Sequence, residues 1–366
     1  MIESFLWLAC GLYALEYTFF LFGQRRVPRV RRSAPPSWPR VTILVAARNE
    51  EPNIARCLES LLAQDCPADR LQIVAVDDQS EDETGAIMHR IADTAPDRVT
   101  VVTTREESSP TRGKARAIAQ GVDHAIGEIV LLTDADCVAP PTWARSVVEH
   151  FVDGVDAFGG FTVISAHDQF SAVQQLDWIH LQSLAAAGLA FNVPLGVIGN
   201  NFAFRREAYD QVGGYRAVSF SVTEDYALFR AMHDRGRRVV YPCTKDTEIV
   251  TLPCASLMEV LSQKQRWSRG GMETGVRGWM VLVIAALMMA AVVIAPFAGV
   301  VPWIVVWSTK FVFDLAVMTP TLQRLGRTSI LRYFLSFEFY FVAQALVVPF
   351  LLMRPTVVWK GRSYRS

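Results

Sequence analysis

The chain has 366 residues, enough for one large domain and additional segments. It carries 36 basic and 36 acidic side chains, and this neutral balance gives no reason to expect a nucleic-acid partner. Six cysteines without a CxxC pair favour a reducing compartment over a disulfide or zinc framework. Apolar residues concentrate at the two ends of the chain, so we expect membrane segments on both sides of a water-soluble domain.

The first apolar run, residues 5–23, has about the length that a bilayer requires and contains one charged residue, Glu16. Five arginines follow it between residues 24 and 32. A cleaved signal peptide carries its positive charge before the apolar run, so this order predicts an uncleaved anchor over residues 1–24, with a cytoplasmic domain after it. Glu16 is expected to face a helix partner or a lipid headgroup. Residues 25–40, basic and then proline-rich, predict a linker.

From residue 41 the pattern alternates between apolar strands and amphipathic helices. The predicted strands cover residues 41–46, 71–76, 99–103 and 129–133, and the predicted helices cover residues 53–64, 83–92 and 114–126. This alternation predicts an α/β domain over residues 41–254, with a mostly parallel sheet and helices on both faces. There is no GxGxxG after the first strand and no GxxxxGK[ST], which argues against a dinucleotide dehydrogenase and a P-loop NTPase.

Two carboxylates, Asp134 and Asp136, come directly after the predicted strand 129–133. Side chains alternate along an extended chain, so both lie on one side and Ala135 turns away. Sites on parallel sheets lie at the carboxyl ends of the strands, and oxygen ligands suit Mg²⁺ or Mn²⁺ holding a diphosphate. The alternative is an ordinary polar turn after a buried strand.

Other charged residues follow the neighbouring elements. Asp77 and Asp78 end the strand 71–76, where a carboxylate can accept hydrogen bonds from a base or a ribose. Lys114 stands at the start of a predicted helix, where a cation is poorly matched to the helix dipole. A phosphate beside Lys114 would relieve that mismatch, and the alternative is a solvated surface lysine.

Eight segments together resemble the family 2 glycosyltransferases, enzymes of the GT-A fold that use nucleotide-sugar donors. They occur in the family's order over about residues 41–270. The segments are residues 45–50, 76–84, 113–117, 133–136, 199–206, 212–215, 223–225 and 263–267.

The resemblance implies a donor site and a metal site. By this resemblance, Asp78 contacts the nucleotide base and Asn49 or Glu50 lies near the ribose. Lys114 contacts the diphosphate or uracil. Asp134 and Asp136 hold Mn²⁺ or Mg²⁺, with Asp136 the direct ligand.

The resemblance also implies a general base, Asp225, in the segment Thr-Glu-Asp that contains Glu224. An acceptor hydroxyl has a very high pKa, so a positioned carboxylate must take its proton as the anomeric carbon is attacked. Such help accelerates a reaction by roughly 10²–10⁴-fold. A single displacement of this kind inverts the anomeric centre.

The pattern QxxRW, formed by Gln263, Arg266 and Trp267, lies in an amphipathic stretch over residues 255–272 and marks membrane-embedded members of the family. On a helix these three side chains share one face. The ring of Trp267 can stack on a sugar, while Arg266 and Gln263 can donate to diphosphate or acceptor oxygens. The alternative is a tryptophan anchored at the membrane surface. We expect an interfacial helix over residues 255–277, with Asn200 and Asn201 lining the acceptor side. Residues 168–190 are either a second interfacial helix or a buried one.

The C-terminal region, residues 278–366, predicts spans over residues 279–300 and 302–318. Lys310 and Asp314 lie four residues apart in the second span and can form an ion pair. A third apolar run, residues 333–353, would place the basic tail outside if it crossed the membrane. It is therefore predicted to be a re-entrant or bent segment that returns the tail to the cytoplasm.

The sequence thus predicts a membrane-bound, inverting glycosyltransferase in a bacterial plasma membrane, with its catalytic domain in the cytoplasm. The expected donor is a UDP-sugar, because UDP is the commonest carrier in the family, and the expected acceptor is a lipid. One alternative is a processive polysaccharide synthase with a glycan acceptor, which needs a channel through the membrane. The other is an inactive scaffold, expected to have lost Asp136, Asp225 or QxxRW, and all three are present.

Overall fold

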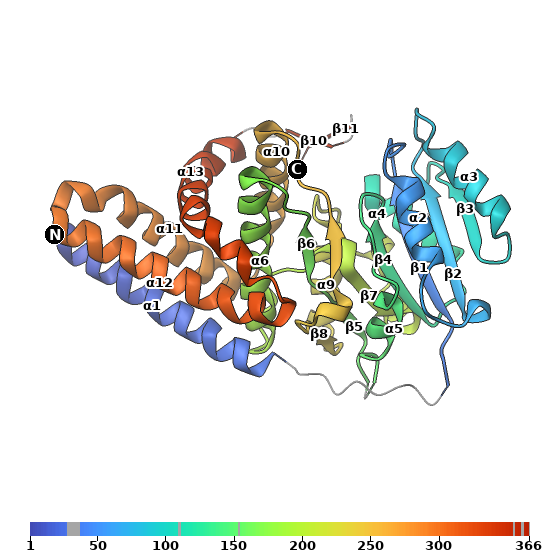
Figure 1. The fold of residues 1–366 in the computed structure, drawn as a ribbon, viewed down its shortest axis with the longest axis horizontal. Coiled ribbons are helices and arrows are strands. Elements are labelled where there is room, and N and C mark those ends of the chain that lie inside the picture. Colours follow the sequence, from blue (N-terminus) through green and yellow to red (C-terminus); the bar gives the residue numbers. More distant parts are fainter. Residues whose placement is uncertain (28–36, 109–110, 153, 354–355, 360–361, 366) are drawn as a thin grey trace.

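The computed structural model describes residues 1–27, 37–108, 111–152, 154–353, 356–359 and 362–365. Most of the predicted linker, residues 28–36, lies outside the described residues. The molecule is elongated, with an α/β domain at one end and a helical bundle at the other (Figure 1). The N-terminus lies at the far end of the bundle, away from the sheet.

The α/β domain is built on a seven-stranded sheet with the strand order β3-β2-β1-β4-β7-β5-β8 among the described residues. These strands are β1 (Val41–Ala47), β2 (Leu71–Asp77), β3 (Val99–Thr103), β4 (Ile129–Asp134), β5 (Ala157–Gly159), β7 (Phe202–Arg205) and β8 (Val239–Val240). Only β7 runs antiparallel to its neighbours, which confirms the predicted mostly parallel sheet. The register pairs Ala46 with Asp134 and Ala47 with Asp77, so the carboxylates that end β4 and β2 lie at one edge of the sheet.

Helices cover both faces of the sheet because its central strands are apolar on both sides. In β1, Ile43 and Val45 face one core and Leu44 faces the other, and all three are fully buried. The first core includes α2 (Ile54–Leu62), α3 (Thr84–Thr94) and α5 (Trp143–Val148), and the second includes α4 (Gly113–Asp123), α7 (Arg206–Gln211), α8 (Gly214–Ala217) and α9 (Glu224–Asp234). A small parallel pair, β6 (Thr162–Ile164) and β9 (Ile249–Thr251), lies between this domain and the bundle.

The bundle contains three long apolar helices, α1 (Ile2–Arg26), α11 (Val276–Ala298) and α12 (Val300–Leu325), which pack against one another. With a fourth helix, α13 (Phe334–Leu352), and the turn before it, these are long and apolar enough to cross a membrane. Glu16 is buried in the bundle, as expected of a residue that faces a helix partner.

The predicted pairing of Lys310 and Asp314 is confirmed. The ammonium of Lys310 lies 2.6 Å from a carboxylate oxygen of Asp314 and 2.6 Å from one of Glu338, on α13. All three side chains are fully buried, and the hydroxyl of Tyr13 donates to Asp314 from α1. This cluster joins three helices of the bundle through charges that have no access to water.

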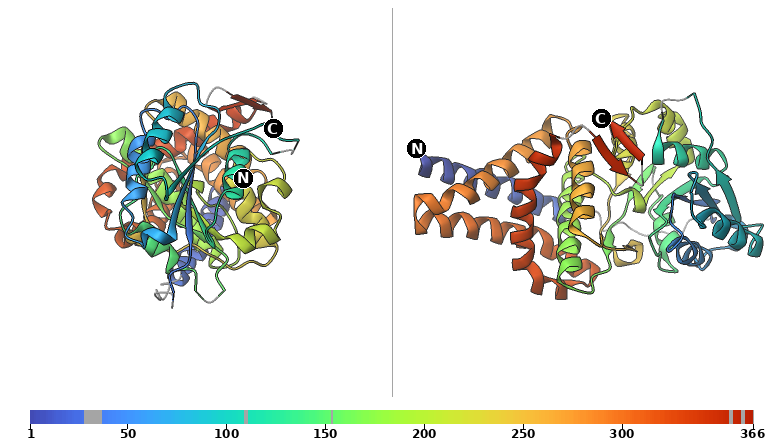
Figure 2. Two further views of the ribbon diagram at one scale, coloured as in Figure 1. Left: turned by 90° about the vertical axis from the view of Figure 1, so that its right-hand side faces the viewer. Right: turned by 90° about the horizontal axis from the view of Figure 1, so that it is seen from above.

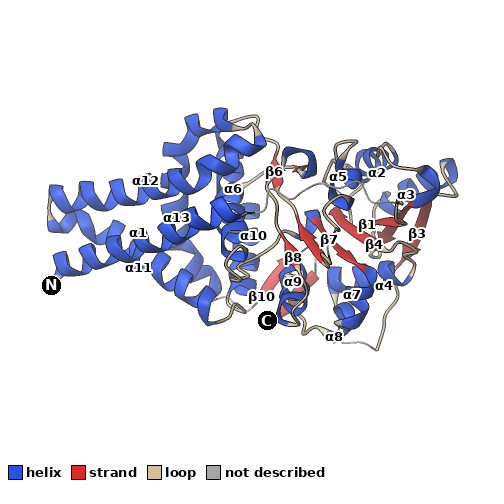
Figure 3. Cartoon of the chain, turned by 90° about the horizontal axis from the view of Figure 1, so that it is seen from below, coloured by secondary structure: helices blue, strands red, loops and turns tan. Residues whose placement is uncertain are grey.

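Between the bundle and the sheet, α6 (Gln169–Leu189), α10 (Leu257–Gly271) and α13 lie side by side (Figure 2, right; Figure 3). In the view from above, they run crosswise to the long helices of the bundle. We call these three helices the crosswise layer. In α6, 16 of 21 residues are buried, so the buried-helix alternative is the correct one for this segment.

After α13, the strands β10 (Thr356–Trp359) and β11 (Arg362–Arg365) pair antiparallel, and β10 packs against α10. In Figure 1 both strands lie near the end of the bundle that faces the sheet. Residues 334–352 form one continuous helix, and the return of the tail to the cytoplasm stays a prediction.

Candidate active site

A cavity of about 370 Å³ opens at the carboxyl ends of β1 and β4, between the sheet and the crosswise layer. Most of the predicted site residues meet there although they come from segments far apart in the sequence. Those that line it are Glu50, Lys114, Asp134, Asp136, Asn200, Glu224, Asp225, Gln263, Arg266 and Trp267.

Asp134, the last residue of β4, and Asp136 lie on the cavity wall, and Ala135 between them lines the cavity as well. Ala135 and Asp136 form a turn, so the extended alternation that was predicted to turn Ala135 away does not continue past Asp134. Burial raises the pKa of Asp136 to about 6, and the negative charges of Asp134 and Glu50 add to this effect. Within the described residues they belong to no group of three or more His, Cys, Asp or Glu side chains able to hold a metal. Asp134 and Asp136 could supply two carboxylate oxygens to a cation whose other ligands are phosphate oxygens and water.

Lys114 lies in the cavity, so its interpretation as a solvated surface lysine is wrong. It is the second residue of α4, and its ammonium lies 2.5 Å from Asp134 Oδ1 and 3.5 Å from Glu224 Oε1. Burial lowers the pKa of Lys114, but the charges of Asp134 and Glu224 outweigh this and raise it above its usual value. Lys114 is therefore a fixed positive charge between β4 and the start of α9.

Asp225 lies in the first turn of α9, where backbone N–H groups hold its carboxylate. Its Oδ2 accepts from the N–H of Gly199 at 2.7 Å and its Oδ1 from the N–H of Tyr226 at 2.8 Å. A Cβ at Gly199 would lie 2.8 Å from the Cβ of Asp225, so only glycine permits this approach. Burial raises the pKa of Asp225 to about 6, Glu224 adds to the rise, and Lys114 opposes it.

The two asparagines of the segment 199–201 have different environments. Asn200 lines the cavity and accepts a hydrogen bond from Thr162 at 2.7 Å. Asn201 is fully buried, accepts from the indole of Trp143 and donates to two backbone carbonyls. The prediction that Asn201 lines the acceptor side is wrong, because core contacts use both ends of its amide.

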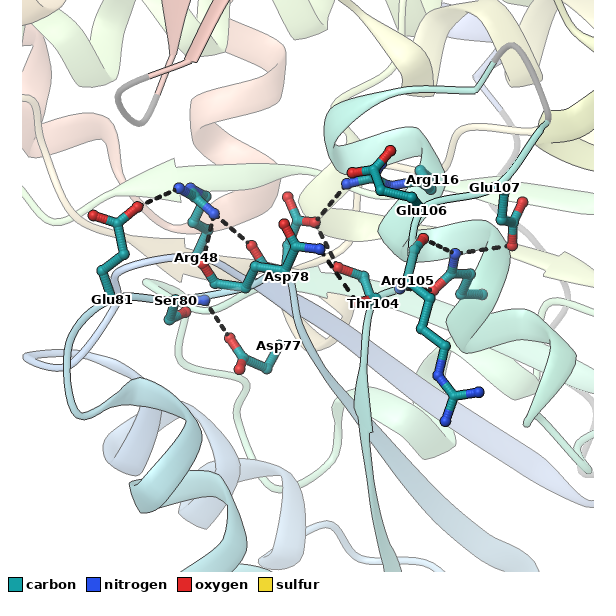
Figure 4. Close-up of polar contacts among 12 residues, drawn as sticks. Arg48, Asp77, Asp78, Ser80, Glu81, Thr104, Arg105, Glu106, Glu107 and Arg116 are labelled. Carbon is teal, nitrogen blue, oxygen red and sulfur yellow. Dashed lines mark hydrogen bonds and ion pairs between the residues drawn. The ribbon is translucent and has the colours of Figure 1, made fainter.

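Asp78, predicted to contact the base, is buried at the end of β2 and does not line the cavity (Figure 4). Its carboxylate accepts from the hydroxyl of Thr104 at 2.9 Å and lies 3.5 Å from the guanidinium of Arg116. Arg48, directly after β1, donates to the backbone carbonyls of Asp78 and Gln79 at 2.8 and 2.6 Å and lines the cavity itself. Arg48 was not among the predicted site residues, although its place beside Asn49 was a usable signal.

Asn49 does not line the cavity either. It adopts a left-handed backbone conformation (φ 52°), and its side chain accepts from the N–H of Glu81 at 2.9 Å. Its own N–H donates to Ser80. Asn49 therefore shapes the loop after β1, while Glu50, the next residue, reaches the cavity wall.

The face of α10 toward the cavity carries Gln263, Arg266 and Trp267, as the spacing predicts. The ring of Trp267 lies 5.0 Å from that of Trp178 on α6, which also lines the cavity and was not predicted. Arg112, before α4, is another unpredicted lining residue. The cavity is thus bounded by carboxylates and Lys114 on the sheet side and by two tryptophans and an arginine on the layer side.

Known proteins share sequence and fold with this chain. The sequence model of the family described as Glycosyltransferase like family 2 matches residues 39–270. A beta-monoglucosyldiacylglycerol synthase of Synechocystis sp. is 26% identical over 300 residues, covering 76% of this chain and 59% of the relative. A poly-beta-1,6-N-acetyl-D-glucosamine synthase of Staphylococcus aureus is 24% identical over 242 residues, covering 65% of this chain and 56% of the relative. The chain thus spans about six tenths of the length of the curated relatives that it matches.

Among solved structures, the mannosyltransferase PcManGT from Pyrobaculum calidifontis in complex with GDP-Man and Mn²⁺ has a TM-score of 0.62 to this chain, at 22% identity. The match covers 93% of this chain and 99% of that one. It supports the assignment of the fold.

Proposed function

The chain belongs to glycosyltransferase family 2, and we propose that it moves a sugar from a nucleotide diphosphate sugar to a hydroxyl of a membrane lipid. One observation carries this proposal: a single cavity joins two carboxylates after β4, a buried carboxylate on α9 and the QxxRW face of α10. These are the parts that a transfer from a diphosphate to a hydroxyl requires, namely a diphosphate site, a base and a surface for sugar or acceptor.

The donor diphosphate would lie against Lys114, Asp134 and Asp136. The aspartates fit a divalent cation, Mn²⁺ or Mg²⁺, because burial and then the negative charges of Asp134 and Glu50 raise the pKa of Asp136 to about 6, and a cation would stabilise the ionised carboxylate. When bound, such a cation stabilises negative charge on the leaving diphosphate. Lys114, at the start of α4, can also stabilise the negative charge on the leaving diphosphate. The nucleoside would lie toward Arg48, which lines the cavity after β1, and a UDP-sugar is the first donor to test.

Asp225 would be the general base. Two backbone N–H groups orient its carboxylate, and a pKa of about 6 leaves it ionised at neutral pH yet able to accept a proton. The base takes the acceptor proton as the hydroxyl oxygen attacks the anomeric carbon and the diphosphate leaves. Attack opposite to the leaving group inverts the anomeric centre.

A lipid acceptor is supported by the place of the cavity. Its layer side is made by α6 and α10, which pack on helices long enough to cross a membrane. The name of the Synechocystis relative, a beta-monoglucosyldiacylglycerol synthase, supports a lipid alcohol as the acceptor. The active site would lie at the cytoplasmic face of a bacterial plasma membrane.

The alternative is a processive synthase with a glycan acceptor, which the name of the Staphylococcus relative favours. Such an enzyme needs a path for the chain through the membrane. In this protein Tyr13, Lys310, Asp314 and Glu338 fill the space where α1, α12 and α13 meet, and their mutual contacts hold these helices together. Single transfer to a lipid therefore fits the bundle better.

The test uses purified protein in bilayers of native lipid, with Mn²⁺ or Mg²⁺ and radiolabelled UDP-glucose, UDP-N-acetylglucosamine and GDP-mannose. An Asp225→Asn variant is assayed in parallel as the control for the base. Label in one discrete lipid band, absent with the variant, supports the proposal and identifies the sugar. A ladder of high molecular weight would instead establish the processive synthase. If both proteins bind the nucleotide sugar and neither transfers it, the inactive scaffold would be the remaining hypothesis.

A further inference from the structure

A buried carboxylate outside the cavity connects all three helices of the crosswise layer. Asp177, on α6, forms an ion pair with the ammonium of Lys264 on α10. Its two oxygens also lie 3.4 Å from the hydroxyl of Tyr340 and 3.2 Å from the amide of Gln344, both on α13. Asp177 is 1% exposed and Lys264 is 6% exposed. Neither side chain lines the cavity, so no role proposed so far explains them.

The partner of Asp177 lies inside the QxxRW segment. Lys264 directly follows Gln263, and its ammonium stands 4.9 Å from the ring centroid of Trp267. Trp178, the neighbour of Asp177 on α6, contacts the same ring from the other helix. Two adjacent pairs thus join α6 to α10: a buried ion pair and, beside it, two tryptophans that line the cavity.

Apolar packing alone does little to fix α10. Of its 15 residues only Val260, Lys264 and Gly270 are buried, so one large apolar side chain contributes to the core. An apolar contact is also non-directional, whereas a buried ion pair is favourable only when its geometry is good. Polar contacts therefore help to set the rotation and the height of α10. Gln265 and Arg269 donate to the backbone carbonyls of Leu351 and Leu352 on α13, and the pair of Lys264 and Asp177 joins α10 to α6 through buried charges.

We propose that Asp177 is a positioning residue: through Lys264 it holds α10 in the register that presents Arg266 and Trp267 to the cavity. This inference rests on the proposed glycosyl transfer, in which those two side chains meet the sugar, the diphosphate or the acceptor. Its role in the reaction is indirect, because Asp177 itself lies behind the cavity wall.

The test distinguishes two roles of Asp177: holding α10 in place, and merely neutralising the buried charge of Lys264. Asp177→Asn leaves the charge of Lys264 buried without its partner, which can unfold the protein on its own. The double variant Asp177→Asn with Lys264→Met removes both charges and keeps the fold testable. Positioning predicts that the double variant still loses kcat by about 100-fold, the effect of misplacing a contact by about 1 Å. Its KM for the nucleotide sugar stays close to that of the wild type, because the nucleoside site lies on the sheet.

Gln169→Ala is the matched control. It removes a 2.9 Å hydrogen bond between α6 and Ser336 of α13 that is exposed to solvent, and it should leave kcat unchanged. Thermal unfolding of each variant shows that the fold is kept. If charge balance were the only role of the pair, the double variant would regain the wild-type kcat, and the inference would be overturned.

A second measurement does not depend on transfer. Hydrogen–deuterium exchange over residues 257–271 should be faster in the double variant than in the wild type and unchanged in Gln169→Ala. If the wild type transfers no sugar from any donor, the proposed function fails, and this exchange experiment alone decides whether Asp177 holds α10. Unchanged exchange over residues 257–271 in the double variant would overturn the positioning role.

Discussion

The loss of activity at acid pH should reflect protonation of Asp225, and the charge of Glu224 should help to set the pH at which this loss occurs. Burial and the charge of Glu224 raise the pKa of Asp225 to about 6, against the opposing charge of Lys114. A general base works only when ionised, so activity is full above this pKa and is lost as the pH falls through it. At pH 5 about one tenth of the molecules keep an ionised Asp225, so kcat/KM should be about tenfold lower than at neutral pH.

The variant Glu224→Gln tests the direction in which the acid limb of the pH–rate profile moves. Removing the negative charge beside Asp225 lowers the pKa of its carboxyl, so the acid limb should move to lower pH. Initial rates at limiting donor concentration, from pH 4.5 to 8, measure this limb in both proteins. A limb that stays in place or moves to higher pH in Glu224→Gln would refute the assignment of the limb to Asp225.

Asp136 also has a pKa of about 6, so its protonation must be told apart from that of Asp225. A bound cation competes with the proton on its carboxylate ligands, and raising the concentration of Mn²⁺ should move an Asp136 limb to lower pH. Asp225 has no such dependence in the proposed mechanism. The limb should therefore be independent of the concentration of Mn²⁺ once the metal is saturating, and a continued shift would assign it to Asp136.

Three further outcomes are expected. A Cβ at Gly270, on α10, would lie 1.8 Å from the hydroxyl of Thr223 at the start of α9, so Gly270→Ala should lower kcat by about 100-fold. A Cβ at Gly271 would have no atom within 4 Å, so Gly271→Ala should have wild-type kinetics. Equal kinetics for the two variants would contradict this contact. Removing divalent cations with EDTA should abolish transfer until Mn²⁺ or Mg²⁺ is restored, and transfer that persists would contradict the metal site after β4. Lys310→Met leaves the carboxylates of Asp314 and Glu338 buried without the lysine, which should lower the free energy of unfolding by about 3 kcal/mol. The variant should then inactivate faster on heating in detergent. An unchanged rate of inactivation would show that the cluster does not contribute to stability.

The sheet and the sheet side of the cavity were predictable from local sequence. A strand buried on both faces, such as β1, reads as a continuous apolar run, and its boundaries differ from the prediction by one residue. The carboxylates after β2 and β4 were predictable because parallel strands bring their carboxyl ends to one edge. The presence of Asp134 and Asp136 on the cavity wall was predictable, but the alternation used to orient them was not, because the strand ends at Asp134 and Ala135 lines the cavity too.

The wrong or missing predictions involve partners that are distant in the sequence. Asn201 is drawn into the core by Trp143 and two carbonyls that no local pattern reveals. Asp177 meets Lys264 and Tyr340, which lie 87 and 163 residues further along the chain. One signal was present, since Asp177 is the single Asp, Glu, Lys or Arg of α6, and a carboxylate in a mostly buried helix needs a partner.

The position of α6 gives the long apolar helices of the bundle a second role in the proposed transfer, beside attachment to a membrane. The donor half of the cavity belongs to the sheet, whereas the other half belongs to α6 and α10. α6 packs on α1 and α12, and His180 on α6 contacts Tyr17 of α1 and lies 3.6 Å from Asp314 of α12. Asp177, three residues before His180, holds α10. The bundle therefore supports the layer side of the cavity, the proposed acceptor side, through one helix. Detergent conditions that loosen the bundle should reduce kcat before they weaken binding of the nucleotide sugar.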